Sequence, residues 1–123
     1  YGIFIALGFA WLENMIYVFH KELGGYETAL ARAIFSVPGH ALFGLEMGYY
    51  LALAKYYHKK ADFIKTFTVP YLLHGTYNYI LFLDRKLLWI PFLAFVLFLW
   101  LIGLKRMNIL LSRSPFKNGF HQK

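Results

Sequence analysis

The 123-residue chain contains no cysteine and few charged residues. The missing cysteines exclude disulfide bonds and thiolate metal ligands within the chain. Charged residues make up 15% of the sequence, whereas a soluble domain carries about 25%. Hydrophobic residues reach 59%, with a mean hydropathy of +0.47. The chain also lacks a glycine-rich phosphate loop and an HExxH motif. This composition excludes an ordinary soluble domain and favours a membrane protein.

Four apolar runs are long enough to cross a bilayer, which takes about 20 residues in a helix. Backbone groups in lipid must be paired internally, so each run is expected to be helical. The chain is therefore predicted to be all-α, a polytopic transmembrane bundle forming one membrane domain, with spans at residues 1–19, 33–54, 67–83 and 87–104. Because it starts with Tyr1 inside an apolar run, we expect it to be a fragment of a longer chain.

Basic residues are distributed unevenly between the segments that connect these runs. With four spans, one side of the membrane carries Lys55, Lys59, Lys60, Lys65, Lys105, Arg106, Arg113, Lys117 and Lys123. The other side carries only Lys21, Arg32, Arg85 and Lys86. The positive-inside rule then predicts an integral protein of the plasma or inner membrane whose basic tail, residues 105–123, is cytoplasmic. This placement of charge predicts the lipid bilayer, and no nucleic acid, as a partner.

Polar side chains interrupt three of the four apolar runs. They are Glu13 with Asn14, His40, and His74 with Asn78. An ionisable group in a bilayer costs about 2.5–3.5 kcal/mol on insertion scales, so such groups indicate function by default. At about 1.5 Å of helix rise per residue, the three ionisable groups lie roughly 9–14 Å from the outer ends of their predicted helices. The matching depths predict that they can meet in the outer half of the membrane.

Small residues provide a packing reason for such a meeting. His40, Gly44, Gly48 and Ala52 repeat every four residues, and Gly44 and Gly48 form a GxxxG pair. Such stripes let a second helix approach closely. The first run carries a similar stripe of Gly2, Ala6, Ala10 and Asn14. We expect these two stripes to pack against each other.

Glu13, His40 and His74 together suit more than one chemistry. A Glu/His/His set can bind a divalent metal such as zinc with a position left open for water. It can equally work without a metal, with the carboxylate activating water and the imidazoles stabilising an oxyanion. Polar residues in membranes also serve as interhelical glue, or as part of a metal or proton carrier, in a non-enzymatic protein. The spacing does not choose between these alternatives.

Two further charged residues have separate expectations. Glu46 lies about 240° around its helix from His40, at about 100° per residue. Glu46 is therefore expected to contact something else, such as Tyr49, Tyr50 or water. Arg32, at the outer end of the second run, is expected either to extend to the interface or to contact a carboxylate of a substrate.

Three segments resemble the motifs of one family, the PrsW-type intramembrane proteases. Residues 8–14, GFAWLEN, are similar to the FAxxEN segment of this family. Arg32 with residues 38–42, PGHAL, is similar to its R…PGH segment, and residues 74–78, HGTYN, to its HGxx[DN] segment. The three segments occur in the family's order. The family is related to the CAAX prenyl-proteases and bacteriocin-immunity membrane proteases.

The resemblance implies an enzyme that hydrolyses peptide bonds within or beside the membrane. The implied substrates are membrane-anchored proteins, such as anti-sigma factors. The implied catalytic residues are Glu13, His40, His74 and Asn78, with Asn14 and Arg32 as substrate-binding residues; a zinc-type metal, if one is used, would be held by the Glu/His/His set. The family's paired-glutamate EExxK motif does not occur in this sequence. We expect it upstream of Tyr1, which would leave this chain an incomplete enzyme.

Overall fold

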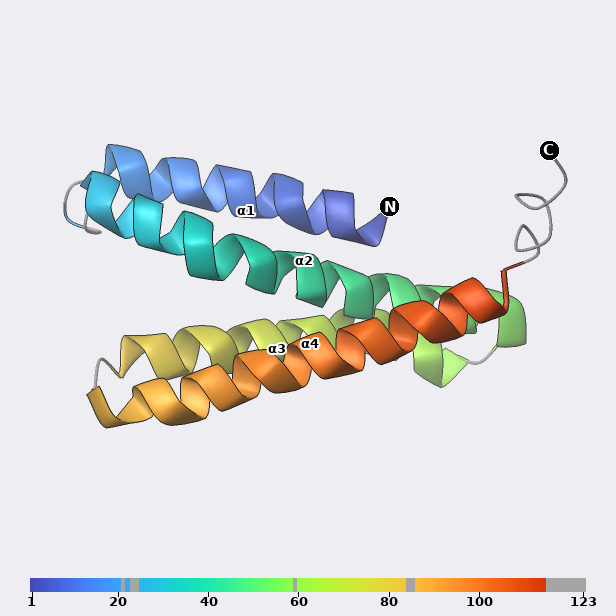
Figure 1. The fold of residues 1–123 in the computed structure, drawn as a ribbon. Helices are drawn as coiled ribbons and strands as arrows, with labels where there is room; N and C mark the ends of the chain where they lie inside the picture. Colours follow the sequence, from blue (N-terminus) through green and yellow to red (C-terminus); the bar gives the residue numbers. More distant parts are fainter. Residues whose placement is uncertain (21, 23–24, 59, 84–85, 115–123) are drawn as a thin grey trace, which may run out of the picture.

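Four long α-helices run alternately up and down (Figure 1). The computed structural model describes residues 1–20, 22, 25–58, 60–83 and 86–114. The elements are α1 (Gly2–Phe19), α2 (Gly25–Tyr57), α3 (Lys60–Phe82), the short 3-10 helix η2 (Lys86–Leu88) and α4 (Trp89–Ser112). The described residues contain no β-strand. The prediction of an all-α fold is therefore confirmed.

The helices extend beyond the apolar runs from which they were predicted. α2 begins at Gly25, not near residue 33, and α4 continues to Ser112, past the expected end at residue 104. Helical hydrogen bonding continues through polar residues at the interface, so a helix need not end where its apolar run ends. Among the topology residues, Lys21, Lys59, Arg85, Lys117 and Lys123 lie outside the described part of the chain.

The sequence predicts four membrane-spanning helices, but only two of the described helices have the length and hydropathy that a membrane span requires. Within the described residues, α1 and α4 are long and apolar enough to cross a membrane. Both expose large apolar side chains, including Phe4, Trp11, Leu97 and Leu101. α2 and α3 do not pass the same test, because charged and other polar side chains lower their mean hydropathy.

α2 is the central helix of the bundle, because it packs against α1, α3 and α4. It contains Pro38 well inside the helix. Proline has no N–H, so the carbonyl of Ile34 loses its usual hydrogen-bond partner four residues along the helix. This interruption lies immediately before Gly39 and His40, the buried residues that form the floor of the site described below.

The contact between α1 and α2 is a seam of small residues, as the sequence predicted. A Cβ atom placed on Gly44 would lie 2.6 Å from the carbonyl oxygen of Gly2 and 2.7 Å from the Cβ of Ala6. Gly44 itself is buried. Because the neighbouring atoms belong largely to the backbone of α1, this close approach requires glycine at residue 44.

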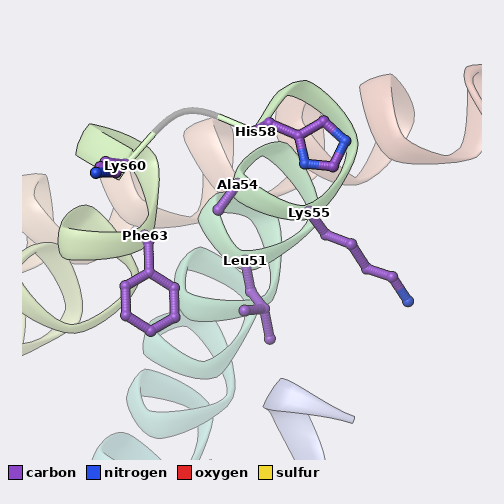
Figure 2. Close-up of a pocket in the computed structure, with 6 residues that line it drawn as sticks. All are labelled: Leu51, Ala54, Lys55, His58, Lys60 and Phe63. Carbon is purple, nitrogen blue, oxygen red and sulfur yellow. The ribbon is translucent and has the colours of Figure 1, made fainter.

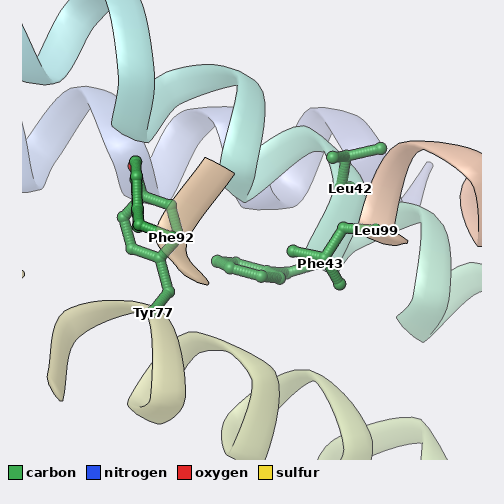
Figure 3. Packing of buried hydrophobic residues seen from close by; sticks show 5 residues of the cluster. All are labelled: Leu42, Phe43, Tyr77, Phe92 and Leu99. Atoms are coloured by element: carbon green, nitrogen blue, oxygen red, sulfur yellow. The ribbon is translucent and has the colours of Figure 1, made fainter. Parts of the chain in front are cut away.

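Aromatic and leucine side chains form the core between α2, α3 and α4 (Figure 3). The buried members are Leu42, Phe43, Tyr77, Phe92 and Leu99. The Tyr77 ring meets Phe92 edge to face at 5.1 Å between ring centroids and Phe43 at 5.9 Å. This cluster holds α3 and α4 against α2 directly beside the residue pair Gly39–His40, because the Tyr77 ring also lies against Gly39.

A buried ion pair joins α2 to the far end of α4. The Glu46 carboxylate, 4% exposed, pairs with the guanidinium of Arg106. Arg106 Nη2 also donates a 3.1 Å hydrogen bond to the Tyr50 hydroxyl, and its guanidinium lies over the rings of Tyr49 and Tyr50. The expected partner of Glu46 was a tyrosine or water. The principal partner is instead Arg106. The sequence predicts that the last span ends at residue 104, which would place Arg106 in the tail.

Replacing Gly44 by alanine should destabilise the bundle, because the new methyl group meets the backbone of α1. Overpacking of this kind costs about 1–3 kcal/mol. Gly48→Ala is the matched control, since a Cβ there has nothing within 4 Å and alanine favours a helix over glycine by about 1 kcal/mol. Thermal unfolding in detergent gives the melting temperature of each variant. Equal melting temperatures for Gly44→Ala and Gly48→Ala would show that the contact between α1 and α2 does not require glycine at residue 44.

Removing one partner of the Glu46–Arg106 pair should destabilise the protein more than removing both. Glu46→Gln leaves a largely buried guanidinium without a counter-charge, and breaking a buried pair in this way costs about 3–5 kcal/mol. Glu46→Gln with Arg106→Gln should recover most of that loss. The measurement is a double-mutant cycle of unfolding free energies in detergent.

The control for this cycle is the Asp62–Lys65 pair on α3, whose two atoms lie 3.0 Å apart; Asp62 is buried, but the lysine side chain is 48% exposed. Asp62→Asn with Lys65→Gln should change stability less than breaking the Glu46–Arg106 pair, because the lysine charge is solvated and a pair open to water contributes little. A Glu46→Gln variant as stable as the wild type would show that the α2–α4 pair does not hold these helices together.

Candidate active site

The structure brings Glu13, His40 and His74 together from three different helices. One ligand atom from each lies within 4.8 Å of the other two. His40 is buried, whereas Glu13 and His74 are half-buried. The expected convergence of a carboxylate and two imidazoles is therefore present in the fold, and α2 provides its floor between α1 and α3.

Glu13 is held by two partners from α2. The Oε2 atom accepts a 2.9 Å hydrogen bond from His40 Nε2 and lies 2.7 Å from Arg32 Nη2. The side chains of Arg32 and Glu13 are 12% and 19% exposed. Within the part of the chain that the structure describes, both partners use Oε2, and no protein group is bonded to Oε1. The carboxylate is thus fixed in place with one oxygen still available as an acceptor.

Arg32 turns toward the bundle. Besides its ion pair with Glu13, its guanidinium carbon lies 4.0 Å from the centre of the Tyr17 ring, in a cation–π contact. Residues 32, 36 and 40 follow one another at four-residue intervals, so they share one face of α2. The alternatives raised for Arg32, an interface side chain or a substrate contact, did not include this pairing with Glu13. Sequence reasoning missed it because the pair depends on how α1 is rotated against α2.

His74 and Asn78 are paired along α3, as expected for residues one helical turn apart. The Asn78 side-chain nitrogen lies 3.0 Å from His74 Nε2. An amide NH₂ group can only donate, so Nε2 accepts and the ring proton belongs to Nδ1. The His74 ring also stacks on Phe43 at 5.4 Å and lies 4.7 Å from the His40 ring. These contacts fix the plane of the second imidazole.

Aromatic rings enclose the two histidines. Phe9 of α1 lies 5.6 Å from the His40 ring and 6.2 Å from the His74 ring, centroid to centroid. Phe43 of α2 lies against both histidine rings. Phe9 is 54% exposed, so this wall faces the outside of the described bundle. The polar centre is therefore bordered by apolar surface, which limits its contact with bulk water.

Asn14 has a different position from the other predicted residues. Its side-chain nitrogen donates a 3.3 Å hydrogen bond to the carbonyl oxygen of Ala29. This bond ties α1 to the first turns of α2, one residue away from Glu13. Asn14 thus links the two helices that carry Glu13 and Arg32, and its predicted part in substrate binding stays a prediction.

Buried hydroxyl groups behind the two imidazoles were not anticipated. Ser36 Oγ and the Tyr77 hydroxyl are buried and find no hydrogen-bond partner among the described residues, as is also true of Arg32 Nε. Ser36 precedes His40 by one turn on α2, and Tyr77 follows His74 by three residues on α3. Unpaired buried polar atoms are the usual partners of internal water.

Comparison with known proteins agrees with the motifs. The profile of the PrsW family intramembrane metalloproteases matches residues 1–104. Relatives named "Protease PrsW" occur in Oceanobacillus iheyensis, with 43% identity over 88% of this chain, and in Clostridioides difficile, with 32% identity over 93% of it. The Bacillus subtilis relative of the same name is 42% identical over 86% of this chain.

The chain spans about half the length of these relatives, covering 49%, 50% and 48% of them respectively. No solved structure matches the chain significantly. The family match includes all three segments that carry Glu13, His40 and His74. From this match and from the site in which the three residues meet, the chain belongs to the PrsW family of intramembrane metalloproteases.

Proposed function

We propose that the protein is an intramembrane endopeptidase that hydrolyses peptide bonds of membrane-anchored proteins, such as anti-sigma factors. The observation that carries this proposal is the meeting of Glu13, His40 and His74 within 4.8 Å. A carboxylate beside two imidazoles is a set that can activate water and stabilise the charge that develops during attack on a carbonyl. Membership of a protease family supports the same reaction class.

Glu13 is the proposed general base. Its Oε2 atom is occupied by Arg32 and His40, so Oε1 is the oxygen that accepts a proton from water. The resulting hydroxide adds to the carbonyl carbon of the scissile peptide bond. The carbon–nitrogen bond then breaks, and the proton held by Glu13 passes to the leaving amine. Arg32 acts as a positioning residue, because it touches Glu13 and fixes the direction of the carboxylate.

His74 is the proposed stabiliser of the oxyanion. Since Asn78 donates to Nε2, the Nδ1–H group of the ring is left to donate to the developing negative charge. A preorganised donor of this kind typically contributes about 10²–10³-fold to the rate. Asn78 positions His74 by fixing both its tautomer and its orientation. In the same way, His40 positions Glu13 through its 2.9 Å hydrogen bond to the carboxylate.

The family's description implies a metal ion, and the donor chemistry of this site fits one. One carboxylate oxygen and two imidazole nitrogens form the His₂Glu set found in catalytic zinc sites. Glu13, His40 and His74 would hold the ion, each imidazole through an unprotonated nitrogen, so in that form His74 would serve as a ligand and not as an Nδ1–H donor. When bound, a zinc-type ion supplies polarisation of the scissile carbonyl and acidification of bound water.

The proposal includes passage of all four helices through the plasma membrane, with the C-terminal end in the cytoplasm. α2 and α3, with 33 and 23 residues, exceed the roughly 20 residues that a span needs. Several polar side chains of α2 pair with charged groups of the neighbouring helices, as Arg32 and His40 do with Glu13 of α1 and Glu46 does with Arg106 of α4. Such pairing lowers the cost of placing them in a bilayer.

Replacing either histidine of the site by alanine should strongly slow cleavage. We expect His74→Ala to lower the rate by about 10²–10³-fold, because it removes the oxyanion donor, and His40→Ala to lower it as well, because Glu13 loses the hydrogen bond that positions it. Asn78→Ala, at an exposed position, should give a smaller loss with no change in folding. The measurement is cleavage of a membrane-anchored reporter by the full-length protein in liposomes, alongside its melting temperature in detergent.

The control for this experiment is His20→Ala, because His20 is exposed at the end of α1 and bonds only to the Ile16 carbonyl among the described residues. Its cleavage rate should equal that of the wild type. Full activity in both His40→Ala and His74→Ala would remove the catalytic assignment. A vesicle assay that detects proton or metal transport without any cleavage would favour a carrier.

A further inference from the structure

A groove lies at the end of the bundle where α2 turns into α3 (Figure 2). Its volume is about 410 Å³, and its lining residues are Leu51, Ala54, Lys55, His58, Lys60 and Phe63. This volume falls within the range of about 300–1,000 Å³ that is typical of ligand pockets. The groove belongs to the end of the molecule opposite the loop between α1 and α2, away from the α1–α2 contacts that Asn14 makes with Ala29.

The floor of the groove is apolar. Figure 2 shows the Phe63 ring and the Leu51 side chain extending in the same direction from two neighbouring helices, with Ala54 between them. Phe63 is 54% exposed and Leu51 is 47% exposed. A floor of this kind suits an aliphatic chain, because covering it removes apolar surface from water.

The rim of the groove is basic and has no acidic partner. Lys55, His58 and Lys60 border it, and no carboxylate pairs with any of them in the part of the chain that the structure describes. The two carboxylates described in this half of the bundle are already engaged, Glu46 by Arg106 and Asp62 by Lys65. The rim therefore attracts an anion from outside the described chain.

We propose that this groove binds an anionic phospholipid, with the headgroup along the basic rim and an acyl chain across Leu51, Ala54 and Phe63. Lys55 and Lys60 extend to opposite sides of the groove with His58 between them (Figure 2), so the rim offers positive charge from both sides. Basic pockets beside membrane helices recognise anionic headgroups in this way. A small soluble anion makes no use of the apolar floor, and a neutral lipid makes no use of the rim. An anionic lipid satisfies both, and the membrane in which the protein lies supplies it.

The proposal depends on insertion into the membrane and not on catalysis. Its test is lipid retention in native mass spectrometry. The protein, purified in detergent, is offered equal amounts of phosphatidylglycerol and phosphatidylcholine with the same acyl chains. The wild type should retain phosphatidylglycerol preferentially. Lys55→Gln with Lys60→Gln should weaken that preference roughly fivefold or more, because each basic residue near a headgroup contributes on that scale.

Two matched controls separate this groove from general attraction to a basic protein. Lys105→Gln with Lys117→Gln removes the same charge from the basic C-terminal segment, and should leave the preference intact. Ala54→Phe should fill the groove and lower retention of both lipids. Ala61→Phe adds the same bulk at an exposed residue outside the groove, and should have no effect.

Three results would overturn the proposal. The first is a Lys55→Gln/Lys60→Gln variant that retains the wild-type preference, or a control pair that loses it equally. The second is an Ala54→Phe variant that retains lipid as well as Ala61→Phe does. The third is displacement of the bound species by inorganic phosphate alone, which would identify the site as a phosphate site and not a lipid site. Cleavage activity is measured separately, so failure of either proposal is recognised independently.

Discussion

The structure depends on how a carboxylate is accommodated between α1 and α2. Glu13 projects from α1, a helix whose outer surface is apolar, and an unpaired carboxylate there would oppose insertion. Arg32 and His40, two turns apart on α2, both bind the same oxygen of Glu13. This arrangement fixes the register of α1 against α2. The close contact of Gly44 with Gly2 and Ala6 is needed for the same pairing, because it brings the two backbones within reach.

α2 carries two buried polar groups that serve different contacts. His40 faces Glu13 and His74, whereas Glu46, six residues later, faces Arg106 on α4. In an α-helix a separation of six residues places side chains about 120° apart at about 100° per residue. One helix can therefore contribute His40 to the Glu13–His40–His74 site on one face and anchor α4 on another. The aromatic core around Tyr77 joins the two regions, since its ring touches Gly39 and Phe43.

The sequence was sufficient for features that depend on periodicity and composition. The four helices and the small-residue seam follow from spacing within single helices. For Glu13, His40 and His74 the spacing predicted matching depths, and the structure shows that the three side chains meet. The sequence did not predict the ion pairs of Arg32 with Glu13 and of Glu46 with Arg106. These pairs depend on how two helices are rotated against each other and on how far each helix extends. Arg106 was assigned to the tail since the apolar run ends at residue 104, although the helix continues to Ser112. The hydroxyls of Ser36 and Tyr77, which find no hydrogen-bond partner among the described residues, carry no sequence pattern.

The most direct measurement of the central claim is an experimental structure of the protein in lipid nanodiscs. It should place the Glu13 carboxylate and the imidazoles of His40 and His74 within about the 4.8 Å found here, with Arg32 on the carboxylate. Density that shows either imidazole turned outward to lipid, or Glu13 separated from both rings, would contradict the account.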